Sequence, residues 1–297
     1  TMIDVGGKKM AAYVNGEGPN TIVFMDQSSP TMVLKGIANW FADENKIVII
    51  DPLGTGFSDD PDTPRTTGNI VTEFHTALHS LNLEGPFVFV THGFTGIYTQ
   101  YYSWAYPEDV KGIIAYDNYL AEEFNDSLRA RDINEAEYKR QSKRVAQERY
   151  FLQRVAGITG FYRWQWPIYE SAFEYGYDDN DFLVMEELFK NTFFNKASVD
   201  EQIHEYENYY SVYGKGFPDE IPVCLCVSYA TDMAHIFYGD WLEYHRNQLS
   251  DNPLSELHYI QGDLNSYYYN IRLTTQFIKH FVKVLNGEAE PDSYKGN

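Results

Sequence analysis

Basic residues, cysteines and long apolar runs are all scarce in this chain of 297 residues. Lys and Arg total 23 against 43 Asp and Glu, which gives a formal net charge of −20. A protein this acidic repels the phosphate backbone of nucleic acids and anionic membrane surfaces. No segment approaches the roughly 18 consecutive apolar residues that a membrane span needs. The composition therefore predicts no nucleic-acid partner and no membrane-spanning helix within this sequence.

The shortage of cysteine also limits the chemistry. Cys224 and Cys226 lie two apart in IPVCLCV, so in a strand they share a face and cannot easily form a disulfide. We interpret both as buried core thiols. We interpret the histidines as surface, loop or packing residues, and we predict no metal site and no cofactor.

Apolar residues are plentiful: 43% of the chain is hydrophobic and 16% is aromatic, which is enough for a large core. Short runs rich in β-branched residues, typical of buried parallel strands, occupy 21–25, 47–50, 86–90, 112–116, 221–227 and 257–260. Amphipathic helical patterns occupy 69–82, 95–106, 240–249 and 269–285. This alternation predicts an α/β fold with a mostly parallel central sheet flanked by helices.

One long region interrupts the alternation. Residues 119–219 show no strand pattern and contain charged and aromatic runs such as ERYFLQRVAG and EYENYYSVYG, which fit helices. An insertion between two strands of such a sheet is most simply a lid over the carboxyl ends of the strands. We therefore predict a core made of 1–118 and 220–297, with an inserted helical lid at 119–219.

Two motifs suggest where chemistry would take place. The strand pattern FVFV runs into THGFT at 91–95 and then into a helix, and the earlier strand IVII runs into DPLGTGFSD at 51–59. A sharp turn between a strand and a helix, with small flanking residues, is the nucleophile elbow of G-x-S-x-G proteins. Here the frame is present, but Gly93 stands at the central position.

On these two motifs the chain resembles the α/β-hydrolase superfamily, in particular the bacterial lid-bearing branch similar to proline iminopeptidase-like and esterase-like hydrolases. The resemblance covers residues 3–118 and 220–284. It implies that Gly93 occupies a vacant nucleophile position and that Leu264, in QGDLNS, occupies a vacant base position. It also implies that Asp117 is the retained acid, with Asp232 as the alternative acid. The triad is therefore degenerate.

The resemblance places further residues at the pocket. Asp26 and Gln27 follow the first core strand, where relatives supply one oxyanion N–H, and Phe94 follows the elbow. We expect Asp26, Gln27, Phe94 and Asp232 to contact a ligand, because ligands in such folds bind at the carboxyl ends of the strands. If Asp26 points inward, its charge would oppose a developing oxyanion.

Glycine cannot attack a carbonyl and leucine cannot accept a proton, so covalent acyl transfer is impossible at these positions. We therefore predict a non-catalytic protein that binds a small molecule or a protein partner. Two alternatives remain open: a serine-independent ester or peptide hydrolase, and a cofactor-free lyase, either of them using Asp117 or another pocket residue.

The chain begins at Thr1, which is not a natural start. We expect that an upstream segment such as a membrane anchor has been removed, which would place the protein on the outer face of a bacterial membrane. A cytoplasmic protein with tag remnants at Thr1 is the alternative.

Overall fold

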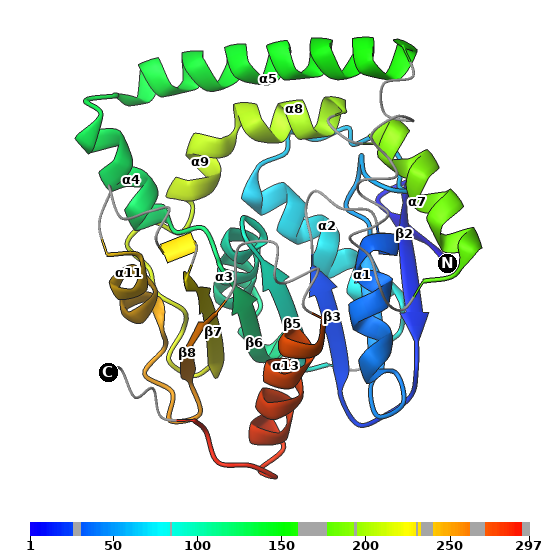
Figure 1. The fold of residues 1–297 in the computed structure, drawn as a ribbon, viewed down its shortest axis with the longest axis vertical. Coiled ribbons are helices and arrows are strands. Elements are labelled where there is room, and N and C mark those ends of the chain that lie inside the picture. The colour runs from blue at the N-terminus through cyan, green and yellow to red at the C-terminus, as the bar shows by residue number, and fades with distance from the viewer. Residues whose placement is uncertain are drawn as a thin grey trace.

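The computed structural model describes residues 1–25, 31–83, 85–159, 177–192, 195–229, 231–232, 240–261 and 271–292. Asp26, Gln27, Leu264 and His235 lie outside these residues. The fold is a central sheet with helices on both faces and a further group of helices at one end (Figure 1).

Eight strands form the sheet, in the order β1-β2-β4-β3-β5-β6-β7-β8. They are β1 (Met2–Val5), β2 (Lys8–Asn15), β3 (Thr21–Met25), β4 (Lys46–Ile50), β5 (Phe87–His92), β6 (Val110–Tyr116), β7 (Val223–Ser228) and β8 (Glu256–Ile260). Two pairs are antiparallel, β1 with β2 and β2 with β4; the pairs from β4 through β3 to β8 are all parallel. The predicted mostly parallel sheet is confirmed.

The parallel strands are buried on both faces, which explains their unbroken apolar sequences. All six residues of β7 are buried, as are five of the six in β5. The predicted strand runs match β3 to β8 within a few residues. The hairpin of β1 and β2 was not predicted, because KKMAAYVN is half exposed and mixes charged with small residues.

Helices cover the two faces of the sheet (Figure 1). One face packs against α1 (Thr31–Ala38) and α13 (Ile271–Leu285), and the other against α2 (Thr67–Ser80), α3 (Thr95–Ala105) and α11 (Trp241–Gln248). Short 3-10 turns lie at Asn39–Phe41 (η1) and Pro107–Asp109 (η2). The helices predicted at 69–82, 95–106, 240–249 and 269–285 correspond to α2, α3, α11 and α13.

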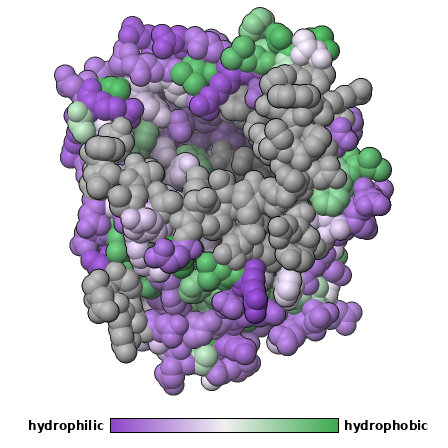
Figure 2. Space-filling model, viewed as in Figure 1, coloured by the Kyte–Doolittle hydropathy of each residue, from purple (hydrophilic) through white to green (hydrophobic). Residues whose placement is uncertain are grey.

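Where the structure describes the segment between β6 and β7, its regular elements are all helices, joined by turns and irregular loops. It contains α4 (Ala121–Ala130), α5 (Glu135–Thr159), α7 (Asp179–Thr192), α8 (Lys196–Ile203) and α9 (Glu205–Tyr210). Figure 1 shows α5 crossing the molecule at the top, with α8 and α9 beneath it. On the same face, the surface is hollowed below α5 (Figure 2). That these helices act as a lid remains a prediction. None of the helices within the described ranges combines the length and apolarity that spanning a bilayer requires.

Candidate functional site

Gly93 forms the turn between β5 and α3, and its backbone has the left-handed conformation expected of an elbow. Its φ is 59°. Its N–H donates to the Tyr116 carbonyl at the end of β6 (3.0 Å), and its own carbonyl accepts from the N–H groups of Gly96 (3.2 Å) and Tyr119 (3.1 Å). The turn is therefore held from three sides, independently of any side chain at position 93.

Among the residues that the structure describes, the space around Gly93 is open. A Cβ built on this residue would have none of their atoms within 4 Å, its two chain neighbours aside. The left-handed backbone alone disfavours a side chain here, at a cost of about 1–3 kcal/mol. The elbow has thus kept both the shape of a turn that presents a side chain and the room for one.

Neighbouring residues show why the turn is sharp. The Thr95 hydroxyl donates to the His92 carbonyl (2.8 Å) and accepts from the His92 N–H (3.1 Å), so it closes the turn. Thr95 is buried and faces the protein interior. Gly96 must lack a side chain, because its Cβ would come within 2.2 Å of the Asn118 side chain. Gly96 therefore lets the first turn of α3 approach the loop after β6.

Asp117 follows β6 directly and is 3% exposed. Its φ of 44° is in the left-handed region, which aspartate tolerates better than most residues. Its carboxylate accepts a hydrogen bond from the Ser228 N–H at 2.7 Å. Burial raises the pKa of Asp117, and hydrogen bonds to Ser228 and Thr231 and the charge of His92 partly offset this rise. A buried carboxyl group, held by the Ser228 N–H, thus follows the strand beside the elbow.

Asp232, the alternative acid, has a different environment. It lies beyond β7, and its carboxylate accepts a hydrogen bond from the Tyr259 hydroxyl at 2.8 Å near the surface. Of the two candidates, Asp117 is the one that is buried and hydrogen-bonded at the turn after a central strand.

Phe94 has its ring packed among aromatic side chains. The ring makes edge contacts with Tyr98, Tyr209 and Tyr119 at centroid distances of 5.5, 5.1 and 6.4 Å. It therefore joins the elbow to α9. The backbone N–H of Phe94 lies at the start of α3 and donates to none of the residues that the structure describes. This N–H, directly after the nucleophile position, is where an elbow offers a hydrogen bond to a bound oxygen.

A buried ionic cluster beside the elbow was not predicted from the sequence. The Arg65 guanidinium donates to Glu73 at 2.7 Å, with the two side chains 2% and 11% exposed. The Tyr98 hydroxyl donates to Glu201 on α8, and the Arg65 N–H donates to Asp200 at 2.6 Å. The cluster thus connects the loop before α2, helix α3 and α8.

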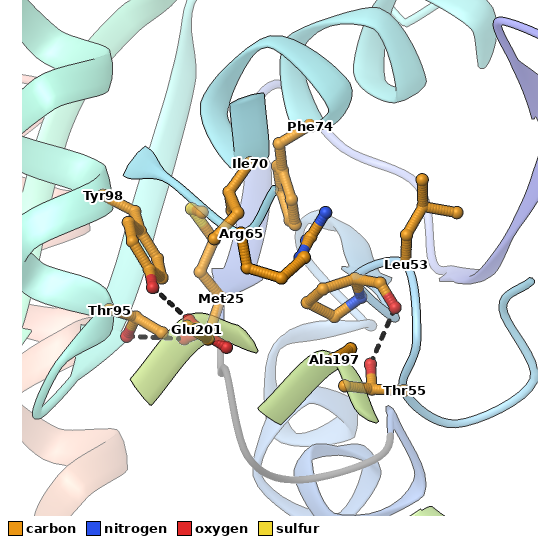
Figure 3. Close-up of a pocket in the computed structure, with 11 residues that line it drawn as sticks. Met25, Leu53, Thr55, Arg65, Ile70, Phe74, Thr95, Tyr98, Ala197 and Glu201 are labelled. Carbon is orange, nitrogen blue, oxygen red and sulfur yellow. Dashed lines mark hydrogen bonds between the residues drawn. The ribbon is translucent and has the colours of Figure 1, made fainter. Parts of the chain in front are cut away.

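These residues surround a small cavity next to Thr95 and Met25 (Figure 3). Its volume of about 10 Å³ is close to what one water molecule needs. The cavity is therefore a packing gap between α8 and the core, and it is too small for an organic ligand.

No family model matches the chain. The uncharacterized protein YbdG of Bacillus subtilis is 34% identical over 127 residues, which are 42% of this chain and 39% of that protein. An uncharacterized protein of Schizosaccharomyces pombe is 27% identical over 88 residues, which are 30% of this chain and 16% of that protein. The matched segments thus span less than half of either relative.

Solved structures match over almost the whole chain. An esterase from Thermogutta terrifontis superposes with a TM-score of 0.67 at 14% identity, covering 96% of this chain and 98% of the esterase. An epoxide hydrolase from Vigna radiata superposes with a TM-score of 0.70 at 17% identity, covering 95% of this chain and 97% of the enzyme. At these identities the likeness concerns the fold. Together with the strand order and the elbow, it shows that the chain has the α/β-hydrolase fold that its motifs predicted.

Proposed function

We propose that this chain binds a small molecule at the elbow without forming a covalent intermediate. The observation that carries the proposal is Gly93: it has an elbow backbone, open space at the Cβ position, and no side-chain atom to attack a substrate. Nucleophilic catalysis needs such an atom. The space that a nucleophile would fill is instead free for part of a ligand.

The surroundings favour a ligand that carries an oxygen acceptor. The Phe94 N–H lies at the start of α3, where backbone N–H groups and the helix dipole favour negative charge. A carbonyl or carboxylate group placed over Gly93 could accept this hydrogen bond. From the sequence, we further propose that Asp26, Gln27 and Leu264 line the same ligand pocket.

A second candidate function is proton transfer without a serine. Asp117 is buried at the turn after β6, and the charge of His92 at the end of β5 is near enough to lower its pKa. A carboxylate in this setting can act as a general base that activates water or abstracts a proton from a substrate. This candidate corresponds to a hydrolase or a cofactor-free lyase.

One set of measurements tests both candidates. The purified chain is incubated with a fluorophosphonate probe and with p-nitrophenyl esters, and a library of small carboxylic acids and esters is screened by thermal shift. We expect no labelling, no ester turnover, and stabilisation by a subset of compounds. Labelling at a mapped residue would contradict the proposal. Turnover of a stabilising compound that is lost in Asp117→Asn would favour the second candidate.

A matched pair of variants locates the ligand. Gly93→Ala places a methyl group in the open space over the elbow, so we expect it to weaken binding. Gly6→Ala is the control, because Gly6 has a similar φ of 63°, also has no atom within 4 Å of its Cβ position, and lies in the β1–β2 turn. Equal loss of binding in both variants would show that the ligand site is elsewhere.

A further inference from the structure

Two histidines and an aspartate converge near the amino ends of the parallel strands, whereas the elbow lies at their carboxyl ends. His75 and His79 lie one turn apart near the end of α2, and Asp109 is the last residue of η2, immediately before β6. Because Asp109 precedes a parallel strand and Gly93 follows one, the two groups lie at opposite ends of the strands. This cluster is therefore separate from the candidate site.

The donor atoms already face one another. The Asp109 carboxylate oxygen Oδ2 lies 3.1 Å from His75 Nδ1 and 2.8 Å from His79 Nε2. All three donor atoms lie within 4.8 Å of one another. Two aromatic residues fix the arrangement: the His75 ring stacks on Tyr106 at 3.7 Å, and the Tyr102 hydroxyl donates to Asp109 at 2.9 Å.

These distances suit a tetrahedral metal ion. Ligand atoms bound to Zn²⁺ at about 2.0–2.1 Å in a tetrahedron lie about 3.3 Å from one another. The two nitrogen–oxygen distances need to lengthen by about 0.2 and 0.5 Å, and the two imidazole nitrogens, which lie within 4.8 Å of one another, need to come to the same spacing of about 3.3 Å. Two imidazoles and a carboxylate are ligand types that Zn²⁺ prefers. The His79 side chain is 48% exposed, so an ion and a coordinating water molecule can enter from solvent.

The interpretation of every histidine as a surface, loop or packing residue overlooked a sequence signal. His75 and His79 are separated by three residues in HTALH, and this spacing places two side chains on the same face of a helix. Asp109 could not be assigned from sequence, because only the fold brings η2 beside α2.

A second group of possible ligands is less suitable. Cys224, Glu256 and His258 also converge, but Cys224 is fully buried and Glu256 is 1% exposed. Both Glu256 carboxylate oxygens are occupied, one by His258 at 2.7 Å and the other by His280 at 3.0 Å. A metal ion would have to break these hydrogen bonds to the Glu256 carboxylate.

We propose that His75, His79 and Asp109 bind a zinc ion that joins the end of α2 to the turn before β6. Three protein ligands and one water molecule complete the coordination. The ion replaces the contacts between the carboxylate and the two imidazoles with shorter coordinate bonds. Because the site is at the far end of the sheet from Gly93, the ion takes no part in binding at the elbow.

Cobalt(II) absorption tests the geometry. After chelator treatment and dialysis, the full chain is titrated with Co²⁺ and then with Zn²⁺. We expect one equivalent of Co²⁺ with the intense visible bands of tetrahedral coordination, displaced stoichiometrically by Zn²⁺. We also expect Zn²⁺ to raise the thermal midpoint by a few degrees.

Variants decide whether these residues are the ligands. His79→Gln and Asp109→Asn should each weaken Zn²⁺ binding by at least about 100-fold, since loss of an outer partner alone typically costs 10–100-fold. His204→Gln is the matched control: His204 also pairs with an aspartate one helical turn away, at 3.5 Å, but outside any three-donor group among the described residues. The His204→Gln variant should bind Zn²⁺ as tightly as the parent chain does.

His79 is half exposed, so we expect the His79→Gln variant to fold. It can therefore test the ligand assignment even if the Asp109→Asn variant unfolds. Failure of the parent to bind Co²⁺ in tetrahedral geometry would overturn the proposal. Binding that survives His79→Gln but disappears in Cys224→Ser would also overturn it, by placing the ion in the second group.

Discussion

The Asp117 carboxylate accepts a hydrogen bond from the Ser228 N–H at 2.7 Å, so the loops after β6 and β7 are joined beside the elbow. Asp117 itself donates its N–H to the Cys226 carbonyl at 2.9 Å. A retained acid of a hydrolase would need such fixed geometry. The burial of Asp117 also makes the stability of the fold depend on pH, which can be measured without any substrate.

The first prediction concerns the pH dependence of stability. Burial raises the pKa of Asp117 above its ordinary value of 3.8, so the unfolded chain ionises this group more readily than the folded chain does. The stability that Asp117 contributes is therefore present below pH 3.8 and is lost as pH rises through the raised folded pKa. Asn at this position does not titrate.

The thermal midpoints of the parent chain and of Asp117→Asn should accordingly be compared across this pH range. We expect the parent's midpoint to fall relative to that of the variant as pH rises, and the difference to level off above the folded pKa. A difference that moves in the parent's favour with rising pH would show that the hydrogen bond to Ser228, and not burial, dominates the pKa.

The second prediction concerns Gly93→Ser. The open space at this position accommodates the side chain, so the variant should fold, with a loss of about 1–3 kcal/mol in the free energy of unfolding from the left-handed backbone. It should show no useful esterase activity, because a serine without a base is a poor nucleophile at neutral pH. Gly6→Ser, with nearly the same φ, is the control for strain.

The double variant Gly93→Ser with Leu264→His tests the predicted triad. We expect weak p-nitrophenyl ester turnover that appears only in the double variant and is removed by adding Asp117→Asn. Adding Asp26→Gly should increase the activity if Asp26 disfavours the oxyanion. Activity of the double variant that is insensitive to Asp117→Asn would point to Asp232 or another acid.

The third prediction compares two glycines of the elbow. Gly96→Ala places a methyl group within 2.2 Å of the Asn118 side chain, whereas Gly93→Ala meets nothing within 4 Å. We expect both variants to lose about 1–3 kcal/mol in the free energy of unfolding, Gly96→Ala through overpacking and Gly93→Ala through its left-handed backbone. Urea denaturation measures both losses, and the two causes are separated by removing the Asn118 side chain.

Removing the obstacle gives the control for this third prediction. In an Asn118→Ala background, Gly96→Ala should cost less than it does in the parent chain. If the cost is the same in both backgrounds, the contact with Asn118 does not explain why glycine is needed at position 96.

The sequence predicted those parts of the fold that depend on local pattern. TIVFM and PFVFV form strands because unbroken β-branched and apolar residues fit a sheet covered on both faces. The elbow was predicted because a left-handed turn between strand and helix needs small residues in a fixed order. The helix α1 was not predicted, since its eight residues are too few to establish a periodic pattern.

The ionic cluster could not be predicted, for a different physical reason. Arg65 lies between the loop at 51–59 and α2, whereas Glu201 lies in α8. Their proximity therefore depends on how the helices between β6 and β7 pack on the core. Charged residues are most often exposed, and the residues next to Arg65 and Glu201 in the sequence give no pattern that predicts their burial. Long-range contacts of this kind become visible only in the folded chain.

The last prediction tests the energetic importance of that cluster. Arg65 is 2% exposed and donates to Glu73 at 2.7 Å, so Arg65→Ala takes the charged partner from a carboxylate that is 11% exposed and leaves it with the Thr63 hydroxyl at 2.8 Å. The substitution also removes the Arg65 side chain from the cavity wall. Breaking one side of a buried ion pair typically costs about 3–5 kcal/mol. Lys9→Ala is the matched control, because Lys9 and Asp4 form an exposed pair at 3.0 Å with side chains 51% and 59% exposed, and solvent and salt screen exposed pairs. Arg65→Met combined with Glu73→Gln should recover part of the loss, since both charges are then removed while side-chain volume is kept. Urea denaturation of all four chains measures these differences, and a cost for Arg65→Ala no larger than that for Lys9→Ala would mean that water reaches Glu73 and replaces the guanidinium as its partner.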